Sequence, residues 1–366
     1  MIPSDSSAKY VGDSLLPKVT IVVPIHNRPH LLGRLLDSVQ LLTYPPNRLQ
    51  LILAGGADDP GRQVVRAFAR IVEFPVDYRP VPEHALRSAS FKRNECARCA
   101  QGDILAFTDD DCMAHHDWIT AAVPLFRAAE VGGVEGAVEI PAPDRLTLTY
   151  RRSLRLSLPG GYQTCNMFYR KSVFEECGGF DLTFPYYLED TDLAYTVLER
   201  GYKIPFAADA AVSHPVPSGH PLKVFTIART VEQMPYLFRK HAQSRLKLRA
   251  SARPLNRSHC LYLALYGGAI ILAAAHPLGG AIGLGLGLSI LMSLQLIHDF
   301  WGLHVTASEF ILTGLSLPVI PVVRLFYWLK GNTRIALRAL DRDGEKRTIS
   351  STKVKEAVSC RGGSSQ

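Results

Sequence analysis

Short apolar runs alternate with amphipathic stripes through the first part of the chain. Val19–Val23 is a β-branched run, and Pro24 stops it because proline donates no hydrogen bond to a strand ladder. Pro29 then opens a stripe of leucine and valine residues at helical spacing. The same patterns predict strands at Leu49–Ala54, Val76–Val81, Ile104–Thr108, Cys165–Tyr169 and Lys203–Ala207, and helices at Arg62–Ile71, Ser90–Gln101 and Asp190–Arg200.

Strands that alternate with helices predict an α/β fold, in which a mainly parallel sheet carries helices on both faces. Open sheets of this kind bind ligands beyond the carboxyl ends of their strands. Two predicted strands end there in polar segments, Pro24-Ile25-His26-Asn27 and Asp109-Asp110-Asp111. We therefore expect the functional site at this edge of the sheet.

The carboxyl-terminal part of the chain has a different pattern. Ser258–His298 contains no Asp, Glu, Lys or Arg, and it is long enough for two spans, since one helix crosses the hydrocarbon with about 20 residues. Pro277, Gly279 and Gly280 lie near its middle and predict the tight turn of a helical hairpin. Phe310–Leu329 is also apolar.

Pro318, Pro321 and Arg324 interrupt that last segment, which favours an interfacial or re-entrant piece over a plain third span. Upstream, Phe225–His241 has the pattern of one amphipathic helix. Such a helix lies either against the membrane surface or on the α/β domain, and the pattern does not choose between the two.

The net charge of +8 is concentrated beside the apolar region. Residues 239–257 carry +7 and residues 330–366 carry +5, so the rest of the chain carries 8 − 12 = −4. Basic flanks mark the cytoplasmic side of a span and attract anionic lipid headgroups. This placement predicts a multi-pass protein of the cell membrane with a cytosolic amino-terminal domain, and it argues against nucleic acid as a partner.

These patterns divide the chain into five parts. We expect a polar amino-terminal segment (1–18), the α/β domain (19–225), an amphipathic and basic linker (226–257), a membrane region (258–329, with the hairpin at 258–298 and the third apolar segment at 310–329) and a basic, disordered cytosolic tail (330–366).

Three adjacent carboxylates follow the predicted strand Ile104–Thr108. Asp109, Asp110 and Asp111 repel one another, and a bound divalent cation of the Mg or Mn type best explains such a cluster. In an extended segment Asp109 and Asp111 point the same way and address one site together. A solvated loop tip is the alternative.

A second acidic group, Glu189-Asp190-Thr191-Asp192, stands at the start of a predicted helix. The helix dipole favours carboxylates there, and Asp190 or Thr191 as a helix cap is the structural alternative. Tyr186 and Tyr187 precede the acids and suggest an aromatic-lined pocket. His214 follows a predicted strand and can offer a neutral imidazole to a metal.

Five short motifs follow one another along residues 19–215. They are Val19-Thr20-Ile21-Val22-Val23-Pro24, Lys92-Arg93-Asn94, Ile104-Leu105-Ala106-Phe107-Thr108-Asp109-Asp110-Asp111, Gly178-Gly179-Phe180-Asp181 and Glu189-Asp190-Thr191-Asp192-Leu193. Each motif is weak alone, but in this order and spacing the chain resembles the family 2 glycosyltransferases of GT-A fold. The resemblance implies an inverting transfer from a nucleotide-sugar donor, assisted by Mg or Mn.

The resemblance also implies roles for single residues. Asp111 holds the metal on the donor diphosphate, Asp109 lies near the ribose or the metal, and Asp190 is the general base. His214 matches a metal-ligating or phosphate-contacting histidine. The donor side further includes Pro24, Asn27, Arg93 and Asp110, and the acceptor-side candidates are Glu189, Asp192 and Tyr187.

One position departs from the family pattern. Relatives place an Asp after the second strand to bind the nucleobase, whereas this chain has Ala54-Gly55-Gly56-Ala57, followed by Asp58 and Asp59. Either those aspartates reach back or backbone groups replace the side chain, so the nucleotide is left open.

Two other functions remain to be tested. A nucleotidyltransferase shares the acidic metal site but usually has a glycine-rich, basic loop where this chain has His26-Asn27-Arg28-Pro29. A noncatalytic membrane scaffold on a transferase fold is supported only by the missing aspartate. For a transferase, membrane attachment favours a lipid-linked or glycan acceptor.

Overall fold

The computed structural model describes residues 16–184, 187–216, 223–245, 247–248 and 253–337. These residues form two compact units. The first runs to Pro221 and includes Leu294–Ile311, and the second contains Leu222–Ser293 and the chain from Leu312 onward.

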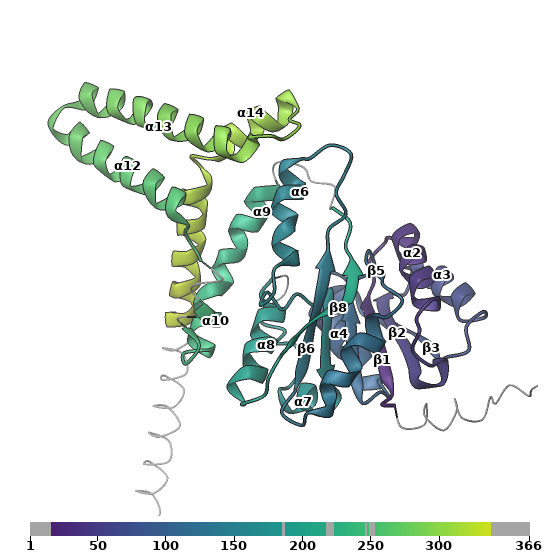
Figure 1. The fold of residues 1–366 in the computed structure, drawn as a ribbon. Helices are drawn as coiled ribbons and strands as arrows, with labels where there is room; N and C mark the ends of the chain where they lie inside the picture. The colour runs from purple at the N-terminus through teal and green to yellow at the C-terminus, as the bar shows by residue number, and fades with distance from the viewer. Residues whose placement is uncertain (1–15, 185–186, 217–222, 246, 249–252, 338–366) are drawn as a thin grey trace, which may run out of the picture. The chain divides into compact units, whose positions relative to one another are not determined.

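An eight-stranded sheet forms the centre of the first unit (Figure 1), in the order β3-β2-β1-β4-β7-β6-β8-β5. Its strands are β1 (Val19–Pro24), β2 (Leu49–Gly56), β3 (Val76–Val81), β4 (Ile104–Thr108), β5 (Met113–Ala114), β6 (Gly133–Glu139), β7 (Asn166–Arg170) and β8 (Phe206–Ser213). The first four strands in this order are parallel, whereas β7 runs antiparallel to both β4 and β6. The expected mixed, mainly parallel α/β sheet is confirmed.

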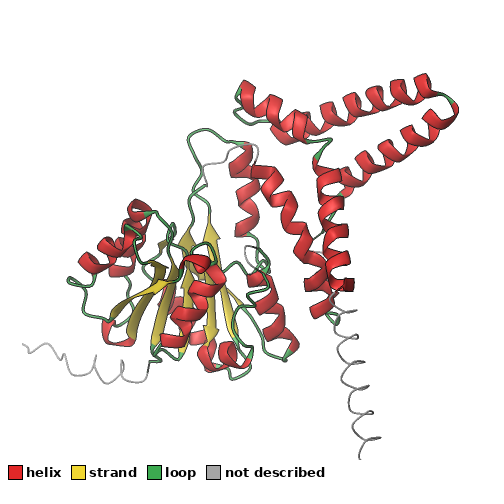
Figure 2. Ribbon diagram, turned by 180° about the vertical axis from the view of Figure 1, so that it is seen from behind, coloured by secondary structure: helices red, strands yellow, loops and turns green. Residues whose placement is uncertain are grey.

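Helices cover both faces of this sheet (Figure 2). They are α2 (Pro29–Gln40), α3 (Gly61–Phe68), α4 (Ala89–Cys99), α5 (Trp118–Ala122), α6 (Leu148–Ser153), α7 (Lys171–Glu176) and α8 (Glu189–Glu199). One hydrophobic core lies under α2, α3 and α5, and a second lies under α4, α7 and α8. Every residue of β1 is buried, as expected for a central strand covered on both sides.

Three strands differ from the sequence expectation. The last long strand begins at Phe206 rather than at Lys203, and it continues to Ser213. The two-residue strand β5 was not predicted. β6 was not predicted either, because its sequence Gly-Val-Glu-Gly-Ala-Val-Glu has only two strand-forming valines, separated by Glu, Gly and Ala, and no continuous apolar run. Its pairing with β7 and β8 is a tertiary effect that overrides local preference.

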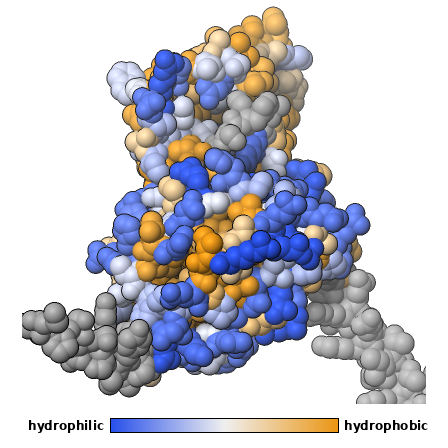
Figure 3. Space-filling view, turned by 90° about the vertical axis from the view of Figure 1, so that its right-hand side faces the viewer, coloured by the Kyte–Doolittle hydropathy of each residue, from blue (hydrophilic) through white to orange (hydrophobic). Residues whose placement is uncertain are grey.

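The apolar helices begin with α12 (Arg257–Ala275) and α13 (Pro277–Phe300), both long and apolar enough to cross a membrane. The turn between them lies at His276, directly before Pro277, so a hairpin turn at the predicted place is confirmed, whereas its extension to Gly279 and Gly280 is not. Both glycines lie inside α13, where apolar helices tolerate glycine. Hydrophobic side chains are exposed over these helices (Figure 3), including Ile271 at 76%.

A bent pair of helices follows. α14 (Ala307–Ser316) and the helix Ile320–Leu337 meet at 48°, so they pass as one span only if taken together. The break contains Pro318, as the interrupting prolines predict. Arg324 donates hydrogen bonds to the carbonyl oxygens of Pro254 and Arg253, at 2.6 and 3.0 Å.

The predicted amphipathic helix Phe225–His241 is not continuous. It is divided into α9 (Lys223–Arg229), the 3₁₀ turn Thr230–Gln233 and α10 (Met234–Lys240). Glu232 in the turn forms ion pairs with Lys330 and Arg334, and a Cβ atom at Gly331 would lie 2.2 Å from its carbonyl oxygen. Within the second unit, this segment therefore contacts the helix Ile320–Leu337.

Candidate active site

The acidic segment after β4 forms a turn. The amide of Cys112 donates to the carbonyl oxygen of Asp109 at 3.1 Å, so residues 109–112 are not extended. Asp109 and Asp111 consequently have different partners, and the prediction that they point the same way is wrong. The cause is local, because the alternation of a strand ends at Thr108, where β4 itself ends.

Arg28 neutralises the far side of this turn. Its Nη2 lies 2.5 Å from Oδ1 of Asp110, and its Nη1 pairs with Oδ2 of Asp111. The other oxygen of Asp110 accepts the amide hydrogen of His26 at 3.0 Å, which ties the turn to the loop after β1. Burial raises the pKa of Asp110 to about 7, although Arg28 and the His26 amide oppose this rise.

The remaining oxygen of Asp111 is suited to a metal. Asp111 Oδ1 is buried, has no hydrogen-bond partner among the described residues and lies 3.7 Å from Nε2 of His214. His214 Nδ1 lies 2.9 Å from the carbonyl oxygen of Pro215, which assigns the proton to Nδ1 and leaves the Nε2 lone pair free. Cys112 completes this group of three possible ligands, but its thiol faces the carbonyl oxygen of Cys165.

These donor atoms fit the predicted cation. A carboxylate oxygen and a neutral imidazole are ligands that Mn accepts, and the carboxylate also suits Mg. Asp109 is not in the group, so its predicted contact with ribose or metal stays a prediction.

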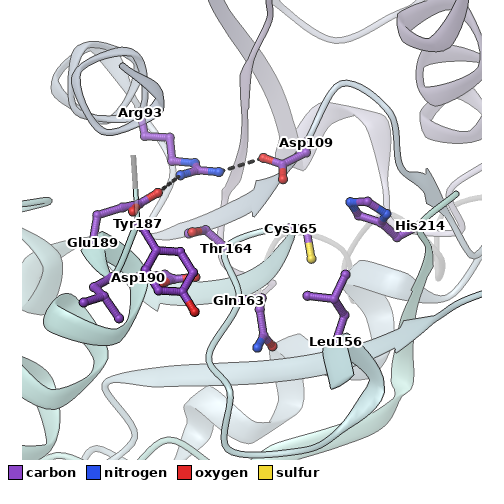
Figure 4. Close-up of a pocket in the computed structure, with 11 residues that line it drawn as sticks. Arg93, Asp109, Leu156, Gln163, Thr164, Cys165, Tyr187, Glu189, Asp190 and His214 are labelled. Atoms are coloured by element: carbon purple, nitrogen blue, oxygen red, sulfur yellow. Dashed lines mark hydrogen bonds and ion pairs between the residues drawn. The ribbon is translucent and has the colours of Figure 1, made fainter. Parts of the chain in front are cut away.

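Arg93 joins the two acidic groups (Figure 4). Its Nη2 lies 2.7 Å from Oδ1 of Asp109, and its Nη1 lies 3.3 Å from Oε1 of Glu189. Its side chain is only 5% exposed and lies against the ring of Phe180. Because a buried guanidinium needs carboxylate partners, Arg93 fixes the separation of these two acids.

Asp190 stands at the start of α8 without capping it. The N-cap is Leu188, which makes no side-chain cap bond, and Asp190 Oδ1 accepts the amide of the adjacent Thr191 at 2.7 Å. The alternative that Asp190 or Thr191 is the cap is wrong. Leu188 adopts a left-handed φ of 74°, a strained conformation that directs the chain into the helix.

The surroundings of Asp190 favour its protonated form. Burial raises the pKa of its carboxyl group to about 7, the neighbouring Glu189 carboxylate raises it further, and the hydrogen bond from the Thr191 amide opposes both. A carboxyl group that titrates near neutral pH can accept a proton with little energetic mismatch.

A pocket of about 200 Å³ separates the two acidic groups. Asp109 and His214 lie on one side, and Tyr187, Glu189 and Asp190 lie on the other (Figure 4). Its remaining lining residues are Arg93, Leu156, Gln163, Thr164, Cys165 and Leu188. Asp192 is 1% exposed and does not line the pocket, whereas Tyr186 lies outside the described residues.

Three consecutive side chains of α4 reach three different segments. Lys92 Nζ donates to the carbonyl oxygen of Ile25 at 2.7 Å, and Arg93 holds the acids. Asn94 forms two hydrogen bonds with the backbone of Phe180, at 2.8 and 2.9 Å. The motif Lys92-Arg93-Asn94 thus connects the loop after β1, the acidic groups and the turn that contains Gly179.

Of the predicted donor-side residues, Pro24 is the last residue of β1 and Asn27 lies in the loop that follows it. Asn27 has a left-handed φ of 52°, and its amide donates to Oδ2 of Asp59 at 2.8 Å. The other oxygen of Asp59 accepts the amide of Gly61 at 2.8 Å. Asp59 is therefore engaged in holding two loops together, while Asp58 is exposed.

The sequence interpretation missed several residues around the site. Arg28 was part of a loop motif without a role, although it lies beside three acids in space. Glu135 on β6 accepts the amides of Gly160 and Tyr162, both at 2.7 Å, and so anchors the segment that leads to Gln163 in the pocket wall. Only the presence of a buried Glu in an otherwise small-residue strand could have signalled that function.

An acidic turn with a metal-suited carboxylate, a separate titrating carboxylate and a pocket between them suit transfer from a phosphate-activated donor. A family model described as "Glycosyltransferase like family 2" matches residues 17–234. The chain belongs to this family. Its enzyme class is glycosyltransferase, which decides against the nucleotidyltransferase and the noncatalytic scaffold.

Curated relatives of this family 2 glycosyltransferase agree with that assignment. Glycosyltransferase AglE of Haloferax volcanii is 27% identical over 222 residues, which are 57% of this chain and 71% of the relative. The O-antigen chain rhamnosyltransferase RfbN of Salmonella typhimurium is 26% identical over 54% of this chain and 66% of its own length.

A solved structure supports the GT-A fold. The mannosyltransferase PcManGT from Pyrobaculum calidifontis, in complex with GDP-Man and Mn²⁺, superposes with a TM-score of 0.58 at 19% identity. The match covers 87% of this chain and 88% of PcManGT. The predicted GT-A-type fold is confirmed.

Proposed function

We propose that this family 2 member is a metal-dependent inverting glycosyltransferase that moves a sugar from a nucleotide-sugar to an acceptor hydroxyl. One observation carries the proposal. The pocket has Asp109 and His214 on one side and Asp190 on the other, and Arg93 bridges the two sides through Asp109 and Glu189. A donor phosphate site and an acceptor-side base must face each other in this way for in-line displacement.

Asp111 and His214 are the residues that would hold the cation, and Asp109 remains a third candidate. A bound Mg or Mn would neutralise the negative charge that develops on the leaving diphosphate. Pro24 and Asn27 form the nucleotide-side loop, and Asp110 holds this loop through the His26 amide. The similar structure of PcManGT is a complex with GDP-Man and Mn²⁺, which supports a nucleotide-sugar and a divalent ion as the proposed ligands of this chain.

Asp190 is the general base of the proposed reaction. Its carboxylate takes the proton from the acceptor hydroxyl as that oxygen attacks the anomeric carbon, on the face opposite the departing diphosphate. One bond to the anomeric carbon forms while the other breaks, so configuration inverts and no covalent intermediate is needed. Glu189 and Tyr187 border the acceptor side, and Glu189 is held by Arg93.

The proposed location is the cytosolic face of the cell membrane. Arg151 donates to the carbonyl oxygens of His298, Asp299 and Trp301, so the carboxyl end of α13 contacts α6 of the sheet domain. If α12 and α13 form a membrane hairpin, its two ends lie on the same side of the membrane, and the basic residues 239–257 before it predict that this side is cytosolic. We therefore propose two spans followed by a re-entrant or interfacial bent pair, with membrane lipids and a lipid-linked or glycan acceptor as partners.

A ligand screen tests the function. The full-length protein in detergent is heated with each of several nucleotide-sugars, with and without Mn, because a ligand of the native state raises the melting temperature. One donor class should raise it only when Mn is present. Stabilisation by donors without any metal dependence would contradict the cation assignment, and no response to any donor would contradict the donor site.

Protease protection of oriented vesicles tests the topology. The catalytic domain should be degraded in vesicles that expose their cytosolic face and protected in vesicles of the opposite orientation. An external catalytic domain would overturn the proposed location.

A further inference from the structure

Arg28 pairs with one oxygen of Asp111, the carboxylate whose other oxygen faces the proposed cation site, and with the neighbouring Asp110. It pairs with Asp110 and with Oδ2 of Asp111, while Oδ1 of Asp111 faces His214. Asp110 is 1% exposed and Asp111 is 14% exposed, so both require a neighbouring positive charge when no ion is bound. The guanidinium supplies this charge.

The side chain of Arg28 is free to leave, but its backbone is not. The side chain is 43% exposed, in contrast to the 5% of Arg93. Its neighbours on both sides are fixed, because Asn27 donates to Asp59 and Pro29 begins α2. The Arg28 carbonyl oxygen also accepts the amide of Leu32. A change of rotamer can therefore release the carboxylates without moving the loop.

Charge arithmetic indicates when this release is favourable. Asp110 and Asp111 carry −2 when both are ionised, and Arg28 already offsets half of it. A divalent ion added beside Arg28 would bring the cluster to −2 + 1 + 2 = +1, and the two cations would repel each other. The diphosphate of a nucleotide restores the balance, since it offers new oxygen partners to both cations.

We propose that Arg28 is a resident counter-cation that competes with the divalent ion for the negative charge of Asp111 and couples metal binding to binding of the donor diphosphate. This inference rests on the proposed metal-dependent donor site. In the absence of nucleotide, Arg28 weakens metal binding. When nucleotide is present, the guanidinium pairs with phosphate oxygens, and metal and nucleotide strengthen each other reciprocally.

Binding of Mn alone is the first test. Free Mn²⁺ is measured by electron paramagnetic resonance while the ion is titrated into the full-length protein. Arg28→Ala should bind Mn more tightly than wild type, by about 5-fold or more, in the range of typical coupling between sites. Arg28→Lys keeps the positive charge but cannot bridge two carboxylates. Its affinity for Mn should therefore lie between those of wild type and Arg28→Ala.

Arg34→Ala is the matched control. Arg34 lies on α2, six residues after Arg28, and its guanidinium contacts the sulfur of Met113 rather than a carboxylate. Its loss removes the same charge and should change Mn affinity by less than about twofold, because an exposed charge that pairs with no carboxylate of the site is largely screened. An equal gain in Arg34→Ala and Arg28→Ala would overturn the specific competition.

Calorimetry with GDP and with UDP, each with and without Mn, is the second test. In wild type, Mn should increase the affinity of the nucleotide that binds. In Arg28→Ala this increase should be smaller by about 5-fold or more. Tighter Mn binding with unchanged nucleotide coupling would refute the coupling and leave only competition. Absence of Mn binding in wild type and in every variant, with or without nucleotide, would instead refute the proposed metal site itself.

The melting temperature of each variant shows whether it is folded. If Arg28→Ala alone is unfolded, Arg28→Lys and Arg28→Gln provide the comparison. Mn affinity unchanged in a folded Arg28→Gln protein, in which the positive charge is gone, overturns the proposal.

Discussion

Two arginines neutralise the acids of the site, and they differ in how firmly they are held. Arg93 is buried on α4 and spans Asp109 and Glu189, so it belongs to the permanent framework of the pocket. Arg28 is nearly half exposed on a loop and holds Asp110 and Asp111 from the solvent side. Arg93 thus fixes the charges on both sides of the pocket, whereas the exposed side chain of Arg28 is the charge that we propose to be exchanged.

The largest expected effect lies on the fixed side. Asp190→Asn should leave donor and metal binding nearly intact and lower the transfer rate by about 100-fold to 10,000-fold, because an amide cannot accept the proton. Single-turnover transfer and calorimetry with the donor measure the two quantities separately. Turnover within about threefold of wild type, at an unchanged melting temperature, would remove Asp190 as the base.

Arg93→Met tests whether Arg93, unlike Arg28, is a permanent part of the structure of the site. It leaves Asp109 and Glu189 without their buried partner and should lower the free energy of unfolding by about 3–5 kcal/mol. Arg98→Met on the same helix is the matched control, since Arg98 is 70% exposed and pairs only with Glu95 in the described structure. That change should leave the melting temperature almost unchanged, because an exposed ion pair contributes little to stability. Equal losses in both variants would contradict the framework role.

Asp111→Asn addresses the metal side. A neutral amide cannot replace a charged ligand on a hard cation, so metal-dependent donor binding should be abolished. Calorimetry with donor nucleotide and Mn checks this loss, while the melting temperature without ligands should change little. Should metal-dependent affinity persist, Asp111 is not the ligand, and Asp109 or Asp110 has to take its place.

The pH dependence gives the smallest and most diagnostic effect. Because burial raises the pKa of Asp190 to about 7, the rate should fall about tenfold per pH unit below that value and level off above it. Folded protein keeps this proton while the unfolded chain loses it near pH 4, so the stability it contributes declines as pH rises from about 4 to 7. Asp190→Asn should remove the dependence of the rate and reduce the dependence of stability, because Asp110, whose pKa burial also raises to about 7, still contributes its own part. A rate that stays flat from pH 5.5 to 8 would argue against this base.

Much of the fold follows from local pattern. β1, β2, β3 and β4 lie within two residues of their predicted ends, because continuous apolar runs bounded by turn residues leave few alternatives. The pattern failed where tertiary contacts decide. β6 contains two glycines and two glutamates and becomes a strand only through its neighbours.

The candidate site was predicted as a set of residue types but not as a set of pairs. Asp109, Glu189, Asp190 and His214 do line one pocket. Asp109 and His214 follow the strands β4 and β8, whereas Glu189 and Asp190 begin the helix α8. The sequence pattern could not predict which arginine pairs with which acid. Arg28 and Asp111 are 83 positions apart in the chain, and Arg93 and Glu189 are 96 apart. Their pairing depends on sheet order, which the linear spacing of motifs does not encode.

Helix α4 also sets limits on how this chain can change in evolution. Lys92, Arg93 and Asn94 point in three directions about 100° apart, and each contacts a segment from a different part of the sequence. Insertions in the loops between motifs alter distances along the chain but not these contacts. A single inserted residue within α4 before Lys92 would rotate all three side chains away from their partners at once. Loop lengths should therefore drift freely among descendants of this gene, while the length of this helix from its Ser88 cap to Asn94 should not.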